Sequence, residues 1–200
     1  TTDAALAEMA ALGVRGVRLN LVSNGEPDGA AAAAQLQAAA KRVAPLGWHV
    51  QIYAKPDLLA LLAPAIRALA VPVVVDHMGA GDGLLAAARP GFTALLGLLA
   101  EGRCWVKISG ANRVSAAGGD YADALPVMRA LIAANPARAV WGTDWPHIGP
   151  HKAGAPEKVV YMPVDNLALL RLLGEAAPDT ATRRAILVDN PATLYGFPAN

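Results

Sequence analysis

Short apolar runs rich in β-branched residues alternate with longer alanine- and leucine-rich segments along the whole chain. This alternation is the strongest constraint on the fold, because the short runs indicate strands and the longer periodic segments indicate helices. Several runs are continuously apolar, so we expect parallel strands that are buried on both faces by helices. The five runs are 13–20, 48–53, 71–79, 104–110 and 139–145.

Polar side chains gather where each predicted strand ends. Strands alternating with helices, with functional groups at the carboxyl ends of the strands, are typical of (β/α)8 barrels. A complete barrel has eight strands and typically about 250 residues. This chain has 200 residues, begins within a predicted helix and shows about five strands. The sequence therefore predicts one α/β domain over 1–200, the carboxyl-terminal part of a barrel that lacks its first strands.

The composition limits the classes of function. Hydrophobic residues make up 54% of the chain, and the net charge of +1 does not favour a nucleic-acid surface. The most apolar stretch, 58–75, is interrupted by two prolines and Arg67, so it predicts a helix followed by a strand and not a membrane span. The single cysteine, Cys104, allows no internal disulfide. We expect a cytoplasmic protein that acts on a small molecule, in an oligomeric state that the sequence does not predict.

Two polar residues at strand ends are the predicted catalytic groups. Asp144 lies in the segment GTDWPH, and a carboxylate there can act as a general base or as a metal ligand. His77 follows the run PVVVD, and glycines at 79, 81 and 83 predict an open loop that leaves its ring facing a cavity. Asp76, one position earlier, is expected to point to the opposite side of the strand and to serve as a hydrogen-bond partner.

Four further residues are predicted to bind the substrate. Arg18 and Arg113 lie near strand ends, where the planar guanidinium matches a carboxylate. The alternative for both arginines is a salt bridge to a neighbouring loop. Tyr53 can donate a hydrogen bond from the end of its strand, and His147 follows Asp144 by three residues.

The motifs GVRGVRLN, VVVDHMG, WVKISGANRVS, VWGTDWPH and DNPATLYGF occur in this order. Together they resemble the second large branch of the amidohydrolase superfamily, and most of all its 2-pyrone-4,6-dicarboxylate lactonase group. The resemblance implies a (β/α)8 barrel in which His77 is the histidine of the fifth strand and Asp144 the aspartate of the last. It also implies that Arg18, Tyr53 and Arg113 bind the carboxylates and the ring of the substrate.

The metal dependence of the site rests on the same resemblance. The H-x-H pair that family members carry on their first strand has no counterpart in this chain. The dicarboxylate lactonases work without metal, so the resemblance implies a site with no cofactor. The alternative is a metal-dependent amidohydrolase or decarboxylase in which His77 and Asp144 bind one divalent ion such as zinc.

The resulting hypothesis is a hydrolase that opens a carboxylated lactone similar to 2-pyrone-4,6-dicarboxylate. Asp144 would activate the attacking water, and His77 would stabilise the oxyanion. The two arginines would hold the carboxylates of the substrate. Lys107, inside a predicted strand, leaves a Schiff-base lyase as a further alternative. A protein that only binds a ligand would keep the arginines and tolerate the loss of Asp144.

Overall fold

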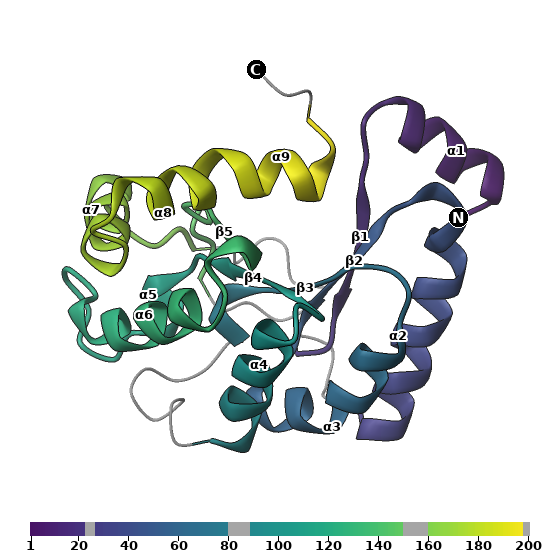
Figure 1. The fold of residues 1–200 in the computed structure, drawn as a ribbon, viewed down its shortest axis with the longest axis horizontal. Helices are drawn as coiled ribbons and strands as arrows, with labels where there is room; N and C mark the ends of the chain where they lie inside the picture. Colours follow the sequence, from purple (N-terminus) through teal and green to yellow (C-terminus); the bar gives the residue numbers. More distant parts are fainter. Residues whose placement is uncertain (23–26, 80–88, 150–159, 198–200) are drawn as a thin grey trace.

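The computed structural model describes residues 1–22, 27–79, 89–149 and 160–197. These residues form strands connected by helices (Figure 1). The strands are β1 (Gly16–Asn20), β2 (His49–Tyr53), β3 (Val73–Val75), β4 (Trp105–Ile108) and β5 (Ala139–Trp141). The α-helices are α1 (Asp3–Ala11), α2 (Gly29–Val43), α3 (Pro56–Ala68), α4 (Pro90–Ala100), α5 (Ala111–Val114), α6 (Leu125–Ala134), α7 (Asn166–Ala176), α8 (Thr180–Arg184) and α9 (Asn190–Tyr195). Short 3₁₀ turns lie at Ala44–Leu46, His77–Gly79, Ala122–Ala124 and Pro136–Arg138, and a π-helical segment at Ala185–Asp189.

The strands form one parallel sheet of five strands in the order of the sequence, from β1 to β5. Each strand pairs with the next one along the chain, as in a (β/α)8 barrel. The predicted α/β class with about five parallel strands is confirmed. The register pairs Asn20 with Tyr53 at the ends of β1 and β2, so the carboxyl ends of neighbouring strands lie side by side.

The two faces of the sheet differ in character. Alternate side chains on the outer face pack into the main apolar core with the helices, among which α2, α3 and α4 lie together on one side of the sheet (Figure 1). The inner face carries Arg18, Gln51 and Lys107, which line a cavity. Burial on both faces was expected for every strand. It holds for β3 but not for β1, where Arg18 and Asn20 are exposed, because the inner face is polar.

The ends of the helices follow from local sequence signals. Thr2 Oγ1 accepts a hydrogen bond from the Ala5 amide at 3.2 Å and caps α1. The segment DNPATLYGF contains α9, which runs from Asn190 to Tyr195. Pro191 lies in the first turn of α9, where no backbone donor is needed, and Gly196 ends the helix at a φ of 69°. Within the described ranges, no helix has the length and apolar character to cross a membrane.

Helices α3 and α4 approach each other closely at Gly91. A Cβ added to Gly91 would lie 1.6 Å from the carbonyl oxygen of Pro56, the first residue of α3. No side chain can occupy this space unless the two helix starts move apart. Gly97, in the middle of the same helix, has room: an added Cβ would meet only the ends of the Arg67 and Glu101 side chains, at 3.7 and 3.9 Å.

The substitution Gly91→Ala is expected to lower the free energy of unfolding by about 1–3 kcal/mol or more, because the methyl group clashes with backbone atoms. The matched substitution Gly97→Ala should raise it by about 0.4–1 kcal/mol, since alanine reduces the entropy of the unfolded chain. Urea unfolding of both variants measures the difference. Equal stability of the two variants would contradict the observed packing of α3 against α4.

Candidate active site

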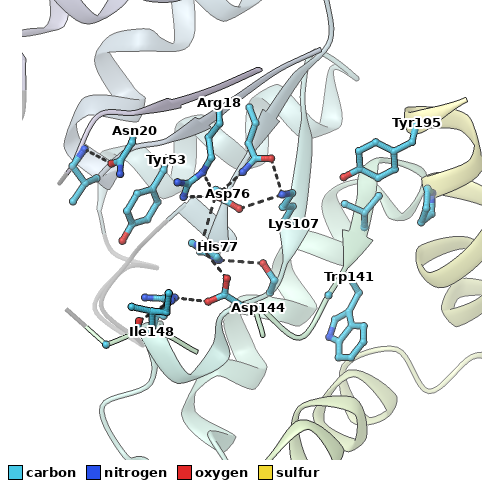
Figure 2. A pocket seen from close by; sticks show the side chains of 18 of the residues that line it. Arg18, Asn20, Tyr53, Asp76, His77, Lys107, Trp141, Asp144, Ile148 and Tyr195 are labelled. Carbon is cyan, nitrogen blue, oxygen red and sulfur yellow. Dashed lines mark hydrogen bonds and ion pairs between the residues drawn. The ribbon is translucent and has the colours of Figure 1, made fainter. Parts of the chain in front are cut away.

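A cavity of about 810 Å³ opens at the carboxyl ends of the strands (Figure 2). Side chains on, or directly after, each of the five strands contribute to its walls. The cavity brings together five of the predicted site residues, together with two others that the mechanism must account for. These are Arg18, Tyr53, His77, Arg113 and Asp144, with Asp76 and Lys107 in addition.

Asp76 and His77 both face this cavity, although they are adjacent in the sequence. Strand β3 ends at Val75, and Asp76 continues its alternation, so its side chain lies on the inner face. His77 then turns, with a φ of 45°, into the left-handed region that few side chains adopt. The expectation that Asp76 points away from His77 was wrong, because the alternation of the strand ends before His77.

The carboxylate of Asp76 is the centre of a hydrogen-bonded network on the inner face (Figure 2). Its Oδ2 accepts hydrogen bonds from Arg18 Nε at 3.0 Å, from Arg18 Nη2 at 2.8 Å and from Gln51 Nε2 at 2.7 Å. Lys107 Nζ lies 3.7 Å from Oδ1, and His77 Nε2 lies 3.6 Å from Oδ2. Because the Asp76 side chain is only 3% exposed, it depends on these partners for its charge.

The charges of this network shift the pKa values of its members. Burial alone would raise the pKa of Asp76, but the His77 ring in its protonated form, the Lys107 ammonium and the Arg18 guanidinium outweigh this effect, and the net shift is downward. Burial lowers the pKa of Lys107, and the nearby Asp76 carboxylate counters only part of this effect. Lys107 Nζ also donates a hydrogen bond to Gln51 Oε1 at 2.7 Å, which holds the ammonium group on the cavity wall.

The ring of His77 has a polar neighbour at each nitrogen. Its Nδ1 lies 3.2 Å from Ser109 Oγ, and its Nε2 lies 3.6 Å from Asp144 Oδ1. Gly110 leaves room for the ring, because an added Cβ would lie 2.9 Å from Nδ1. Burial lowers the pKa of His77 more than the carboxylates of Asp76 and Asp144 raise it. The imidazole is therefore neutral at neutral pH and can donate one N–H into the cavity.

Asp144 lies in the turn after β5, with a φ of 65° that aspartate tolerates better than most residues. Its Oδ2 accepts a 2.6 Å hydrogen bond from Arg113 Nε, and Arg113 Nη2 also donates to the carbonyl oxygen of Ile148 at 3.2 Å. Its Oδ1 is the oxygen near His77. One carboxylate oxygen is thus bound by a cation, while the other lies beside a neutral imidazole at the edge of the cavity.

The arginines predicted to hold substrate are already paired with carboxylates. Arg18 pairs with Asp76, and Arg113 pairs with Asp144. The salt-bridge alternative raised by the sequence is therefore present, although both guanidinium groups still line the cavity. The ring of Tyr53 contacts His77 and Arg18. It lies edge-on to the His77 ring at 5.4 Å between centroids, and the Arg18 guanidinium carbon lies 5.1 Å from the Tyr53 centroid.

His147 does not line this cavity. Its side chain is buried, and its ring Nε2 lies 2.8 Å from Asn166 Oδ1 at the start of α7. Its expected contact with substrate therefore finds no support in its position. The predicted loop with Gly81 and Gly83, beyond His77, lies outside the described residues.

Sequence reasoning missed Gln51, which bonds both Asp76 and Lys107. A signal was present in the strand HVQIY, where polar side chains at 49, 51 and 53 alternate with apolar ones. Such a period of two indicates that one face of the strand is polar. Reading it would have placed Gln51 on the same face as Tyr53.

The described residues do not fit a metal centre. They contain no group of three or more His, Cys, Asp or Glu side chains that could hold an ion. His77 lies between Asp76 and Asp144, but arginines already bind an oxygen of each carboxylate. Burial raises the pKa of the Cys104 thiol to about 12, which removes it as a thiolate ligand.

Residues 1–197 match the amidohydrolase family. The chain belongs to this family. It is 36% identical over 151 residues to the 4-sulfomuconolactone hydrolase of Hydrogenophaga intermedia. The aligned region covers 76% of this chain and 48% of that protein. It is also 35% identical over 206 residues to the 2-pyrone-4,6-dicarboxylate hydrolase of Comamonas testosteroni. This aligned region covers 97% of this chain and 63% of that protein. The chain thus spans about half to two thirds of the length of these curated relatives.

Solved structures share the amidohydrolase fold seen here. A proposed 2-pyrone-4,6-dicarboxylic acid hydrolase from Pseudomonas putida has a TM-score of 0.80 at 32% identity, over 100% of this chain and 70% of that chain. An amidohydrolase from Burkholderia multivorans with bound zinc has a TM-score of 0.70 at 23% identity, over 96% of this chain and 69% of that chain. At that identity, the second likeness shows the fold alone.

The substitution Asp76→Ala is expected to lower the free energy of unfolding by about 3 kcal/mol, because it leaves two cations without their shared carboxylate. This value is the low end of the range for broken buried ion pairs, since Arg18 is 42% exposed. Asp57→Ala is the matched control: Asp57 is 69% exposed and pairs with Arg89 at 3.4 Å, so it should cost less than about 1 kcal/mol. Denaturant unfolding of both variants checks this, and equal costs would contradict the central place of Asp76.

Proposed function

We propose that the protein hydrolyses a carboxylated lactone similar to 2-pyrone-4,6-dicarboxylate, with Asp144 as the general base. The observation that carries the proposal is the position of the Asp144 carboxylate. One of its oxygens is bound by Arg113 at 2.6 Å, and the other lies 3.6 Å from His77 Nε2, in a cavity lined by three cationic side chains. The named relatives that act on a pyrone dicarboxylate and on a sulfomuconolactone support the substrate class.

Asp144 would remove a proton from a water molecule, and the resulting hydroxide would add to the lactone carbonyl carbon. His77 would donate its N–H to the oxyanion that forms. The bond between the carbonyl carbon and the ring oxygen then breaks, and the proton held by Asp144 passes to that oxygen. Arg113 Nε binds Asp144 Oδ2 and so orients the carboxylate, with Oδ1 on the side of His77 to accept the proton.

The charge on the cavity walls favours an anionic substrate. Arg18, Lys107 and Arg113 face the cavity with two carboxylates, and His77 is neutral, so the described walls carry an excess of one positive charge. Lys107 is the cation with the least direct compensation, because its short contact is to the neutral amide of Gln51. A substrate carboxylate would neutralise the excess positive charge, and the long-range attraction between the two charges would favour its entry into the cavity.

The Schiff-base alternative rests on Lys107, whose pKa is lowered by burial. The hydrolase remains the better account, because the Lys107 side chain is already engaged in the polar network: its Nζ donates to Gln51 Oε1 at 2.7 Å and lies 3.7 Å from Asp76 Oδ1. The metal-dependent alternative requires ligands beyond the described residues. We propose a reaction that uses protein groups alone, in a cytoplasmic protein.

Asp144→Asn is expected to lower kcat by about 10²–10⁴ while the affinity for the lactone stays nearly constant, because the size is kept and the base is lost. Steady-state kinetics of the full-length protein, with the dissociation constant of the unreacted lactone, measure the two effects. The control is Asp179→Asn, at the exposed cap of α8, which should keep the parent kcat. A nearly normal turnover in Asp144→Asn would remove this carboxylate from the mechanism.

Removal of metal ions should leave the activity unchanged. Full-length protein dialysed against a chelator is expected to keep its kcat, to contain no stoichiometric metal by elemental analysis, and to gain nothing from added zinc. A catalytic zinc needs about three protein ligands and one open position. Stoichiometric zinc or manganese in the active protein, with activity lost on chelation and restored by the ion, would overturn the metal-free proposal.

A further inference from the structure

His147 joins the turn that carries Asp144 to a separate helix. The residue is 3% exposed, and its Nε2 lies 2.8 Å from Oδ1 of Asn166, the first residue of α7. In the tautomer with hydrogen on Nε2, the ring donates to this amide oxygen. Its Nδ1 is then an unprotonated acceptor, and it is buried with no hydrogen-bond partner among the described residues. Among the described residues, the contact with Asn166 is therefore the one hydrogen bond that this buried ring makes, and its loss would leave both ring nitrogens without a partner there.

The backbone of the same turn is bound on both sides of His147. Its amide donates to the carbonyl oxygen of Asp144 at 3.1 Å, and its own carbonyl accepts from the Met162 amide at 2.8 Å. His147 itself has a φ of 56°, in the left-handed region that a non-glycine residue enters at a cost. The hydrogen bond from the His147 ring to Asn166 thus helps to stabilise this strained backbone conformation.

Arg113 closes the arrangement on the cavity side. Its Nε holds Asp144 Oδ2, and its Nη2 holds the carbonyl oxygen of Ile148, the residue after His147. Asp144 and Ile148, at the two ends of the turn, therefore both accept hydrogen bonds from the Arg113 guanidinium. His147, between them, contacts Asn166 of α7. A shift of the turn would move the Asp144 carboxylate relative to both Arg113 and His77.

We infer that His147 is a positioning residue for Asp144, acting through its hydrogen bond to Asn166 and the turn between them. The inference rests on the proposed function, in which Asp144 is the base. His147 does not line the cavity, so we expect its loss to lower the rate of the chemical step and to leave binding nearly unchanged. Misplacement of a reacting group by about 1 Å can cost about 10²-fold in rate, which sets the scale of the effect.

The test compares two replacements of His147 in the full-length protein. Glutamine can place an amide nitrogen near the position of Nε2 and so keep the donor to Asn166, whereas asparagine is too short to reach it. Asparagine tolerates a positive φ better than glutamine, so a purely backbone role would favour it. We expect His147→Gln to keep most of kcat, and His147→Asn to lose about 10- to 100-fold in kcat with KM within about twofold.

Asn166→Ala should reproduce the loss of kcat seen in His147→Asn. The double variant should lose little more kcat, because both substitutions remove the same hydrogen bond. Asn190→Ala is the control for a general loss of stability. Asn190 is also buried, and its Nδ2 donates to the carbonyl oxygens of Pro136 and Ala139 at the start of β5. This control should unfold more easily than the parent and keep the parent kcat.

Crystal structures of the parent and of His147→Asn give a readout that is independent of activity. The inference predicts that the 2.6 Å contact between Arg113 Nε and Asp144 Oδ2 is kept in the parent and lengthened or lost in the variant. An unchanged contact would overturn the inference whatever the protein catalyses. An additive double variant, or a parent kcat in His147→Asn, would also overturn it. Lactone hydrolysis absent from the parent would instead overturn the proposed function.

Discussion

The carboxylate of Asp76 is the interaction on which the polar face of the sheet depends. A buried carboxylate is stable only with charged and hydrogen-bonding partners, and here Arg18, Gln51, Lys107 and His77 provide them. The same contacts fix where these side chains lie on three different strands and in the turn after β3. His77 lies next to this network, with its Nε2 3.6 Å from Asp76 Oδ2 and 3.6 Å from Asp144 Oδ1.

The two carboxylates of the site differ in environment and therefore in chemistry. The Asp76 side chain is 3% exposed, its Oδ2 accepts three hydrogen bonds from the protein, and its Oδ1 lies 3.7 Å from Lys107 Nζ. The Asp144 side chain is 20% exposed, and one of its oxygens remains free to face the cavity beside a neutral imidazole. Environment separates a structural carboxylate from a reactive one, which is the pattern expected when only one of two acids acts as a base.

Much of this arrangement could be predicted from the sequence. The five strands followed from the apolar runs, and the carboxyl ends of those strands marked the edge where Arg18, Tyr53, His77, Arg113 and Asp144 meet. These features follow from local sequence patterns and from the geometry common to parallel sheets, so a single sequence is sufficient to predict them. The roles assigned to the five residues stay predictions.

The errors share a physical cause, which is local backbone geometry that residue patterns do not encode. Asp76 and His77 were assigned to opposite sides by strand alternation, but a φ of 45° at His77 turns its ring back over the cavity. His147 was placed beside the substrate because it follows Asp144 by three residues, but the turn directs its ring toward α7. Long-range partners such as Asn166 decide such positions, and they are distant in the sequence.

The central claim is that Asp144 activates a water molecule that attacks the lactone carbonyl. It is tested most directly by a single-turnover reaction of full-length protein, in excess over lactone, in H₂¹⁸O. Mass spectrometry then locates the label in the product and in the peptide that contains Asp144. The account predicts ¹⁸O in the new carboxylate of the product and none in the peptide. Label in Asp144, from covalent attack by its carboxylate, or label in the released hydroxyl group, would contradict the account.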